Sequence, residues 1–244
     1  MMCAFLGECS DEIFGGYPWF FREDCLTSNT FPWSIATSER QEILHPEISK
    51  KINLKEYINY RYSESLAEVE ILDSDSEETA QKRKISYLTI NWFMQTLLDR
   101  SDRMAAATDL DIRVPFCDYR LVQYLWNVPW EMKAIDNREK GLLRHIVKGL
   151  LPKEIVERKK SPYPKTHNPT YLANVKQMLI SIMNDKNSPI NNLINREYIL
   201  DIINTDGKSF IRPWYGQLMT GPQLMAYLIQ VNMWLDEYNP ILKI

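Results

Sequence analysis

Three carboxylates stand close together near the start of the chain, in the segment GECSDEIFGGY at residues 7–17. They are Glu8, Asp11 and Glu12, and three of the eight glycines of the chain surround them. Hard cations such as Mg²⁺ take oxygen ligands and usually share them with substrate phosphates, so one of these carboxylates could be a metal ligand. The alternative is a strand-to-helix turn in which Ser10 or Asp11 caps the helix and the acids complement its dipole. These residues alone fit both interpretations.

A basic segment follows much later, at residues 133–165, with ten Lys and Arg residues against four acids. Its run Arg158-Lys159-Lys160 directly precedes the proline-rich SPYPKTHNP, where a helix must stop, so these side chains are expected on a loop. A solvated helix face is the usual meaning of such a charge run. Acids in one element and bases in another would, however, fit a Mg²⁺–polyphosphate substrate, with carboxylates for the metal and cations for the phosphates.

Between these two segments, residues 102–121 read DRMAAATDLDIRVPFCDYRL. Small residues are expected to end a helix there, and a proline then makes a stiff turn that carries Arg113 and Asp118. A buried ion pair, Arg113 with Asp118 or Asp102 with Arg103, would explain the charges without any ligand. The ion-pair interpretation is favoured for this segment.

The composition is that of a folded globular protein of 244 residues, with 45% hydrophobic and 25% charged residues. It excludes disordered, collagen-like and disulfide-scaffold proteins. The net charge of −3 gives no global field toward nucleic acid or anionic lipid. Four cysteines without CxxC spacing and three histidines without HExxH predict neither structural zinc nor a disulfide framework.

No membrane span or signal peptide is expected. The longest uncharged run, residues 213–235, contains prolines, glycines and amides, and its apolar part is too short to cross about 30 Å of hydrocarbon. The N-terminus MMCAFLGECSDE has no basic n-region and soon turns acidic. The predicted location is the cytoplasm.

The elements that must position these residues can be read from hydrophobic periodicity. Residues 2–6 predict a buried strand that ends at a glycine, and ligands of open α/β sheets bind at the carboxyl ends of strands. Residues 64–78 carry seven acids and no base, which predicts a solvated helix end and linker. Helices are expected at residues 54–69, 85–98, 118–126, 139–150, 168–183, 196–203 and 223–238, with Asp118, Asn168 and Asn195 as caps.

Taken in order, the three segments resemble the synthetase domain of the glutamine-hydrolysing asparagine synthetases. GECSDEIFGGY resembles the motif G-E-G-[SA]-D-E-x-F-G-G-Y, and DRMAAATDLDIRVPFCD resembles D-R-x-S-M-A-x-x-x-E-x-R-x-P-F-L-D. KGLLRHIVKGLLPKEIVERKK resembles K-x-x-L-R…L-P…I…R-x-K. The resemblance covers residues 3–164, and the last eighty residues agree only in being helical.

The resemblance implies an α/β fold, namely the C-terminal part of a PP-loop ATPase domain of the adenine nucleotide α-hydrolase type. Here it would be mostly α-helical, with a short parallel-strand remnant at the N-terminus. Residues 1–165 would form the C-terminal part of the ATP-dependent domain, and residues 166–244 a helical extension of it. The implied ligase uses ATP and Mg²⁺ to join aspartate to AMP with loss of pyrophosphate. Ammonia from glutamine then attacks the β-aspartyl-AMP to give asparagine.

The resemblance also implies roles for single residues. Glu8 matches a glutamate beside the acyl-adenylate and the incoming ammonia, Asp11 a Mg²⁺ ligand, and Lys160 a lysine that offsets phosphate charge as pyrophosphate leaves. Gly7 matches a glycine whose backbone approaches the substrate. The remaining matches shape the nucleotide pocket: Ser10, Lys140, Arg113 and Asp118.

Two features of the family are absent from the sequence, the motif S-G-G-x-D-S and an N-terminal glutaminase domain. The chain is therefore interpreted as the C-terminal portion of a longer enzyme, inactive alone, and a homodimer is compatible with the resemblance. Cys9 stands where the motif has glycine, and it would be strained if that position needs a positive φ. Two alternatives stay open: a related adenylating synthetase that forms an amide or a β-lactam, and a non-catalytic fragment that binds a partner through residues 224–235.

Overall fold

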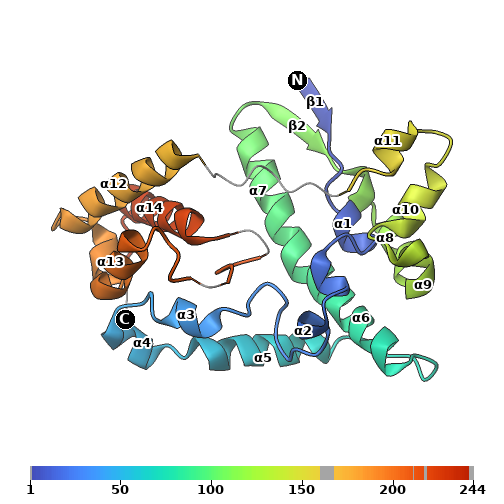
Figure 1. Cartoon of the computed structure of the whole chain (residues 1–244), viewed down its shortest axis with the longest axis horizontal. Helices are drawn as coiled ribbons and strands as arrows, with labels where there is room; N and C mark the ends of the chain where they lie inside the picture. The colour runs from blue at the N-terminus through green and yellow to red at the C-terminus, as the bar shows by residue number, and fades with distance from the viewer. Residues whose placement is uncertain (1, 160–167, 211, 217–218, 242–244) are drawn as a thin grey trace. The chain divides into compact units, whose positions relative to one another are not determined.

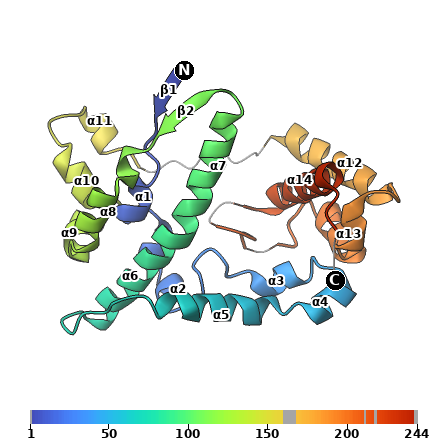
Figure 2. The same cartoon turned by 180° about the vertical axis from the view of Figure 1, so that it is seen from behind.

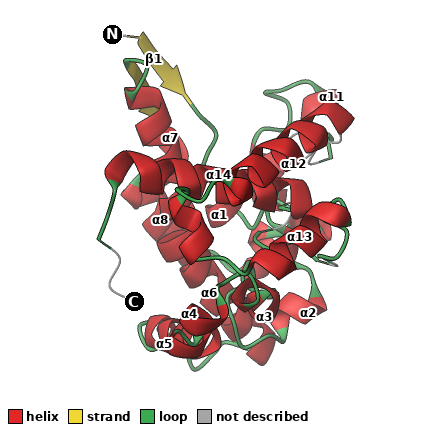
Figure 3. Ribbon diagram, turned by 90° about the vertical axis from the view of Figure 1, so that its left-hand side faces the viewer, coloured by secondary structure: helices red, strands yellow, loops and turns green. Residues whose placement is uncertain are grey.

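The computed structural model describes residues 2–159, 168–210, 212–216 and 219–241. The chain forms two compact units, one of Met1–Asn29 and Tyr62–Lys160, the other of Thr30–Arg61 and Ser161–Ile244. Helices make up most of the described residues, with one short pair of strands (Figure 3). The described residues are mostly α-helical and include a short parallel two-stranded sheet, which agrees with the expected α/β fold.

The strand pair lies in the first unit, where β1 (Met2–Phe5) runs parallel to β2 (Leu110–Arg113) (Figures 1 and 2). The register continues past the strands, because Leu6 N donates to Arg113 O at 2.9 Å. The strand expected at residues 2–6 is confirmed. Its expected burial is wrong: Met2 and Phe5 are 74% and 75% exposed, because the described part of the chain gives β1 a single neighbouring strand.

A long helical rod supports this pair and consists of three consecutive segments (Figures 1 and 2). They are α6 (Glu77–Leu88), a π-helical turn at Thr89–Met94, and α7 (Gln95–Ala106). The Ser76 side chain caps the rod by accepting from Thr79 N. The apolar stretch expected at residues 85–98 lies in the middle of the rod and buries several side chains, among them Ile85, Leu88 and Met94.

The rest of the first unit consists of short helices. They are α1 (Ser10–Ile13), η1 (Pro18–Phe20), α2 (Glu23–Leu26), η3 (Pro115–Cys117), α8 (Tyr119–Trp126), α9 (Trp130–Lys133), η4 (Ile135–Asn137), α10 (Gly141–Ile146) and α11 (Lys153–Val156). Asp118 caps α8 as expected, accepting from Arg120 N. The helix expected at residues 139–150 is shorter: α10 begins after Lys140, whose φ is positive, and ends at Ile146, three residues before Gly149, whose φ is also positive.

The second unit contains the C-terminal helices α12 (Pro169–Asn184), α13 (Arg196–Asn204) and α14 (Gly221–Tyr238), with the short helix η5 (Pro189–Asn192) between the first two. The caps expected at Asn168 and Asn195 are confirmed. The same unit includes α3 (Thr37–Gln41) and α4 (Pro46–Lys51), and α5 (Leu54–Leu66) runs from this unit into the first. The core between α12, α13 and α14 is fully closed to solvent at Leu179, Ile199 and Met225.

The stretch between α5 and α6 is exposed over most of its length, as expected for the acidic residues 64–78. The helix expected at residues 54–69 is shorter than predicted: α5 ends at Leu66, so Val69 lies outside it.

Two glycine backbones touch inside the second unit. A Cβ at Gly221 would lie 2.2 Å from Gly207 Cα and 2.7 Å from Gly207 O, both backbone atoms that cannot rotate away. Gly221→Ala should therefore lower the free energy of unfolding by about 1–3 kcal/mol, the usual cost of overpacking. Urea denaturation followed by circular dichroism measures it. Gly7→Ala is the matched control, because nothing lies within 4 Å of a Cβ there. Equal unfolding midpoints for the two variants would contradict the prediction.

Candidate functional site

The candidate site begins where β1 ends, in the loop that carries the three carboxylates. Cys9 precedes α1 with φ 72°, a left-handed conformation, so the strain foreseen for a cysteine at this position is present. The left-handed turn makes Ser10 the first helical residue, and its Oγ donates to Gly7 O at 2.7 Å. The expectation that Ser10 or Asp11 caps this helix is therefore wrong.

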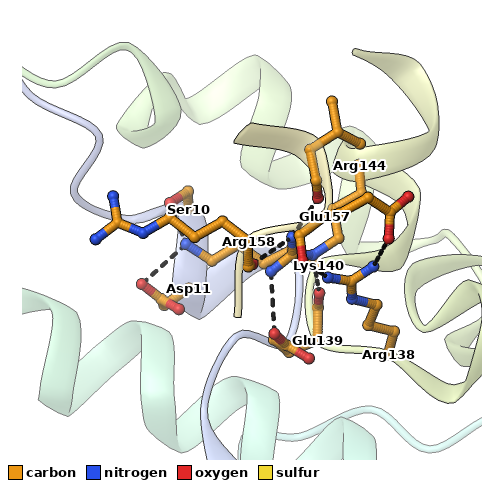
Figure 4. Close-up of polar contacts among 9 residues, drawn as sticks. Ser10, Asp11, Arg138, Glu139, Lys140, Arg144, Glu157 and Arg158 are labelled. Carbon is orange, nitrogen blue, oxygen red and sulfur yellow. Dashed lines mark hydrogen bonds and ion pairs between the residues drawn. The ribbon is translucent and has the colours of Figure 1, made fainter. Parts of the chain in front are cut away.

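Lys140, which is 130 residues from Ser10 in the sequence, contacts this loop. Its Nζ lies 3.0 Å from Asp11 Oδ2 and 2.9 Å from Ser10 Oγ, and both charged side chains are about one-fifth exposed. Lys140 stands in the left-handed conformation just before α10, and Figure 4 shows its side chain reaching toward Asp11 on α1. The structure thus brings together three of the residues that the resemblance singles out, Ser10, Asp11 and Lys140.

Gly16 makes this arrangement possible. Its N–H donates to Asp11 O at 2.7 Å. A Cβ on Gly16 would lie 1.9 Å from Asp11 Oδ1 and 2.7 Å from Lys140 Cε. Only glycine leaves room for the ion pair. The sequence shows a cluster of glycines here, but it does not show which one faces Asp11.

Glu8 has a different set of partners, all on α7. Ser101 Oγ lies 2.9 Å and 2.8 Å from the two carboxylate oxygens of Glu8, and Arg100 Nη2 lies 3.0 Å from one of them. Sequence reasoning missed Arg100 and Ser101. The only signal for them is that they directly precede the segment that begins at Asp102.

Glu12, the third carboxylate, points into the interior. It is 2% exposed, and Tyr17 Oη donates to its Oε1 at 2.6 Å. The Tyr17 ring stacks on Trp19 with centroids 4.2 Å apart. Burial raises the pKa of Glu12 and also the pKa of Tyr17, whose ionised form would face the carboxylate. Glu12 therefore belongs to the support of the loop.

The raised pKa of Glu12 predicts a pH dependence of stability. A carboxyl whose pKa is higher in the folded state binds more protons there, so the free energy of unfolding falls as pH rises from 4.5, its usual pKa, through the folded value. Glu12→Gln removes the titrating carboxyl and with it this pH dependence of the free energy of unfolding. The stability of the wild type relative to the variant should decrease with rising pH in that window, measured by denaturation at a series of pH values.

Tyr17→Phe is the matched control. The Tyr17 hydrogen bond lowers the pKa of Glu12, so its loss should raise that pKa further and extend the decline to higher pH. A wild-type stability that rises relative to Glu12→Gln over the same window would contradict the assignment.

The charged side chains of β2 and of the turn after it form ion pairs with residues close by in the sequence. Arg113 Nη2 pairs with Asp111 Oδ2 at 2.7 Å, and Asp118 Oδ2 pairs with Arg120 at 2.6 Å. The Arg120 guanidinium lowers the pKa of Asp118 to about 2. Of the two buried pairs expected here, Arg113 with Asp118 is wrong, because each of these residues has a partner two residues away and on the surface. Arg103, expected to pair with Asp102, pairs with Asp99 Oδ1 at 2.8 Å. Arg113 is exposed, and its side chain lines a groove apart from the Asp11 group.

Two arginines of the basic segment hold main-chain oxygens, an arrangement that we call the carbonyl clamp. Arg144 Nη1 donates to Val156 O at 2.5 Å and to Arg158 O at 3.0 Å. Arg138 Nη2 donates to Glu157 O at 2.6 Å, and Arg138 Nη1 pairs with Glu157 Oε2 at 2.9 Å (Figure 4). Two of the cations of this segment therefore form hydrogen bonds within the protein, to main-chain oxygens of the same chain.

Lys160, predicted to be catalytic, lies outside the described residues, so its convergence with Glu8 and Asp11 on one cleft stays a prediction. Within the described ranges, no three or more His, Cys, Asp or Glu side chains gather as a metal cage. No helix in these ranges is long and apolar enough to cross a membrane.

The carboxylate loop and Lys140, which precedes α10, meet at the carboxyl end of a parallel strand, the place where open α/β sheets bind ligands. The chain belongs to the asparagine synthase family, whose model, described as Asparagine synthase, matches residues 1–236. It is similar to asparagine synthetase [glutamine-hydrolyzing] 3 of Bacillus subtilis (strain 168), with 50% identity over 233 residues. That match covers 96% of this chain and 38% of the relative.

Two other relatives are more distant. Asparagine synthetase [glutamine-hydrolyzing] 1 of Bacillus subtilis (strain 168) is 25% identical over 82% of this chain and 36% of its own length. The asparagine synthetase [glutamine-hydrolyzing] of Gallus gallus is 39% identical over 35% of this chain and 15% of its own. The chain thus spans less than two-fifths of the length of these relatives.

Proposed function

We propose that this chain is the C-terminal part of the ATP-dependent domain of an asparagine-forming ligase, a PP-loop ATPase domain. Aspartate and ATP give β-aspartyl-AMP and pyrophosphate, and ammonia then displaces AMP to give asparagine. The observation that carries the proposal is the group of Asp11, Ser10 and Lys140 at the carboxyl end of β1, in a chain of the asparagine synthase family.

Mg²⁺ fits this group as an ion shared with substrate. Mg²⁺ is usually held by one or two carboxylates together with substrate phosphates. Asp11 is the one carboxylate of the loop that faces Lys140, since Glu12 is buried against Tyr17 and Glu8 is held by α7. Asp11 would hold the ion, and the chemistry supplied is neutralisation of charge on the departing pyrophosphate.

Glu8 would accept a proton at the ammonia step. When ammonia attacks the acyl carbon, a C–N bond forms, AMP leaves, and the new nitrogen carries a proton that must be lost. Ser101 holds both carboxylate oxygens of Glu8, which fixes the rotamer from which one oxygen can take that proton. Arg100 supports the charge of the carboxylate before transfer.

The carbonyl clamp supports a role for Lys160 in the same site. It fixes the main chain up to Arg158, two residues before Lys160. Pre-organised cations stabilise charge that develops on leaving phosphates, and the proposal assigns that role to Lys160. Gly7 and Lys140 would complete the pocket for ATP.

The other parts of the proposal concern the substrates, the partners and the organisation of this chain. Aspartate, ATP and ammonia would be the substrates, with ammonia delivered from glutamine by an N-terminal glutaminase domain of the same enzyme. The division into residues 1–165 and 166–244, the homodimer and inactivity of the chain alone are also proposals. The missing S-G-G-x-D-S motif supports that inactivity, because half of the phosphate cradle would come from upstream residues.

Pyrophosphate release with ATP and aspartate tests the proposal. The chain alone should show none above a no-enzyme control. A chimera in which the chain replaces the matched 38% of the Bacillus subtilis relative should release pyrophosphate and form asparagine. Turnover by the chain alone that is lost in Lys160→Ala would contradict the fragment interpretation. A folded chimera that forms an amide or lactam product other than asparagine would contradict the substrate.

A further inference from the structure

The turn formed by Gly15 and Gly16 lies directly against an indole ring. A Cβ on Gly15, whose φ is +68°, would lie 2.5 Å from Trp130 Cη2 and 2.9 Å from Trp130 Cζ3. These two atoms belong to the far edge of the six-membered ring, so the full length of the side chain is needed to reach the turn. Both glycines are buried, and Trp130 is the first residue of α9. The main chain of the turn therefore rests on an aromatic ring.

The Trp130 ring is itself held on several sides. Phe20 stacks on it with ring centroids 5.1 Å apart and an interplanar angle of 25°, and the Phe21 ring contacts it with centroids 5.8 Å apart. The Lys82 ammonium lies 5.0 Å from the centroid of the same ring, within the range of a cation–π interaction. Because its partners come from η1 and from α6, the ring is fixed in the position from which it supports Gly15.

The chain just after α9 contacts the other partner of the ion pair. A Cβ on Gly141, the residue after Lys140, would lie 2.4 Å from Ile135 N and 2.5 Å from Ile135 O, both main-chain atoms. Ile135 follows the last residue of α9 by two positions. At one end of α9 Trp130 thus supports the turn that faces Asp11, and at the other end the main chain meets the residue that follows Lys140. One short helix therefore bridges the two sides of the ion pair.

We propose that Trp130 is a positioning residue for the ion pair between Asp11 and Lys140. Gly16 N–H donates to Asp11 O at 2.7 Å, and the space beside Gly16 is the space that the ion pair fills. With a shorter side chain at position 130 the turn could move toward α9, and the Asp11 carboxylate would lose its fixed orientation. The effect on catalysis rests on the proposed function, whereas the effect on the ion pair does not.

A double-mutant cycle on the full chain measures the ion pair directly. Asp11→Asn, Lys140→Met and the double variant are unfolded in urea, first with Trp130 present and then in a Trp130→Phe background. Phenylalanine keeps an aromatic ring on α9 but lacks the Cη2 and Cζ3 atoms that meet Gly15. The unfolding constants should show a coupling of roughly threefold between Asp11 and Lys140 in the wild-type background, and a coupling close to one in the Trp130→Phe background.

Adenylation by the chimera is the second measurement. Exchange of pyrophosphate into ATP should show that kcat falls about tenfold to 100-fold in Trp130→Phe, because a small misplacement of reacting or charged groups has effects of this size. Trp126→Ala is the matched control. It also removes an indole beside a cation of α6, since the Arg83 guanidinium carbon lies 5.7 Å from the Trp126 ring centroid, but it leaves the ring that meets Gly15. This control should keep the wild-type kcat and coupling.

The outcomes separate this inference from the proposed function. If the wild-type chimera forms no β-aspartyl-AMP, the proposed function fails, and the cycle on the chain alone still decides whether Trp130 positions the ion pair. A coupling near one already in the wild type, an unchanged coupling in the Trp130→Phe background, or wild-type kcat in the Trp130→Phe chimera would each overturn the inference. A lower unfolding midpoint with an unchanged coupling would show that Trp130 only stabilises the fold.

Discussion

Asp11→Ala in the chimera is expected to abolish formation of β-aspartyl-AMP while the first unit stays folded. The substitution removes the carboxylate that would share Mg²⁺ with the phosphates and leaves the Lys140 ammonium without its ion-pair partner. Lys160→Ala should have the same effect, because it removes a cation opposite the leaving pyrophosphate. Losing such a group withdraws several kcal/mol of charge stabilisation from the transition state, roughly 10²–10³-fold or more in rate.

Glu8→Ala separates the two chemical steps. General-base effects are typically 10²–10⁴-fold, so this variant should impair the ammonia step or adenylation without unfolding. Isotope exchange between pyrophosphate and ATP measures adenylation, a product assay measures asparagine, and circular dichroism controls for folding. If Lys160→Ala keeps wild-type rates, the basic residues Arg158–Lys160 are the end of a solvated helix and bind no phosphate. The assignment of the site then fails.

Gly16→Ala should inactivate the site with little change in stability, which is the second large effect we expect. The added methyl group would lie 1.9 Å from Asp11 Oδ1 and 2.7 Å from Lys140 Cε. Both atoms belong to side chains that can swing away, so the protein can relieve the clash by separating the ion pair. We expect a loss of about 100-fold or more in adenylation, comparable to removal of one charge-stabilising group, and an unfolding midpoint close to that of the wild type.

A double variant shows whether this loss acts through Asp11. If it does, Gly16→Ala combined with Asp11→Ala should be no slower than Asp11→Ala alone, because the group that the methyl displaces is already absent. Additive losses in the double variant, or full activity in Gly16→Ala, would show that the space beside Asp11 is not required.

Local signals in the sequence were sufficient to predict several elements of the structure. The caps at Asp118, Asn168 and Asn195 were predicted because a cap depends on one side chain and the next two or three residues. The strand at the start of the chain was also predicted from a short apolar run. Its burial was not, because burial depends on which other segments cover the strand, and periodicity carries no information about them.

Contacts between distant segments could not be predicted in this way. β2 has only four residues, and it becomes a strand by pairing with β1. The resemblance selected Lys140 and Asp11 separately, but their ion pair depends on a left-handed turn before α10. Ser101 carries no motif and becomes relevant only because α7 brings it to Glu8. Cys9 is a partial exception: because it stands where the motif has glycine, strain was expected there if the position needs a positive φ, and its φ is 72°.

The carbonyl clamp has an evolutionary consequence. Arg138 and Arg144 bind main-chain oxygens at residues 156–158, and every residue type supplies such an oxygen. Natural selection acting through the clamp would therefore leave the identity of the exposed residue at position 158 free to drift. It would instead act against insertions and deletions between Arg144 and Lys160, because a change of one residue would offer the guanidinium groups different oxygens and displace the lysine that follows.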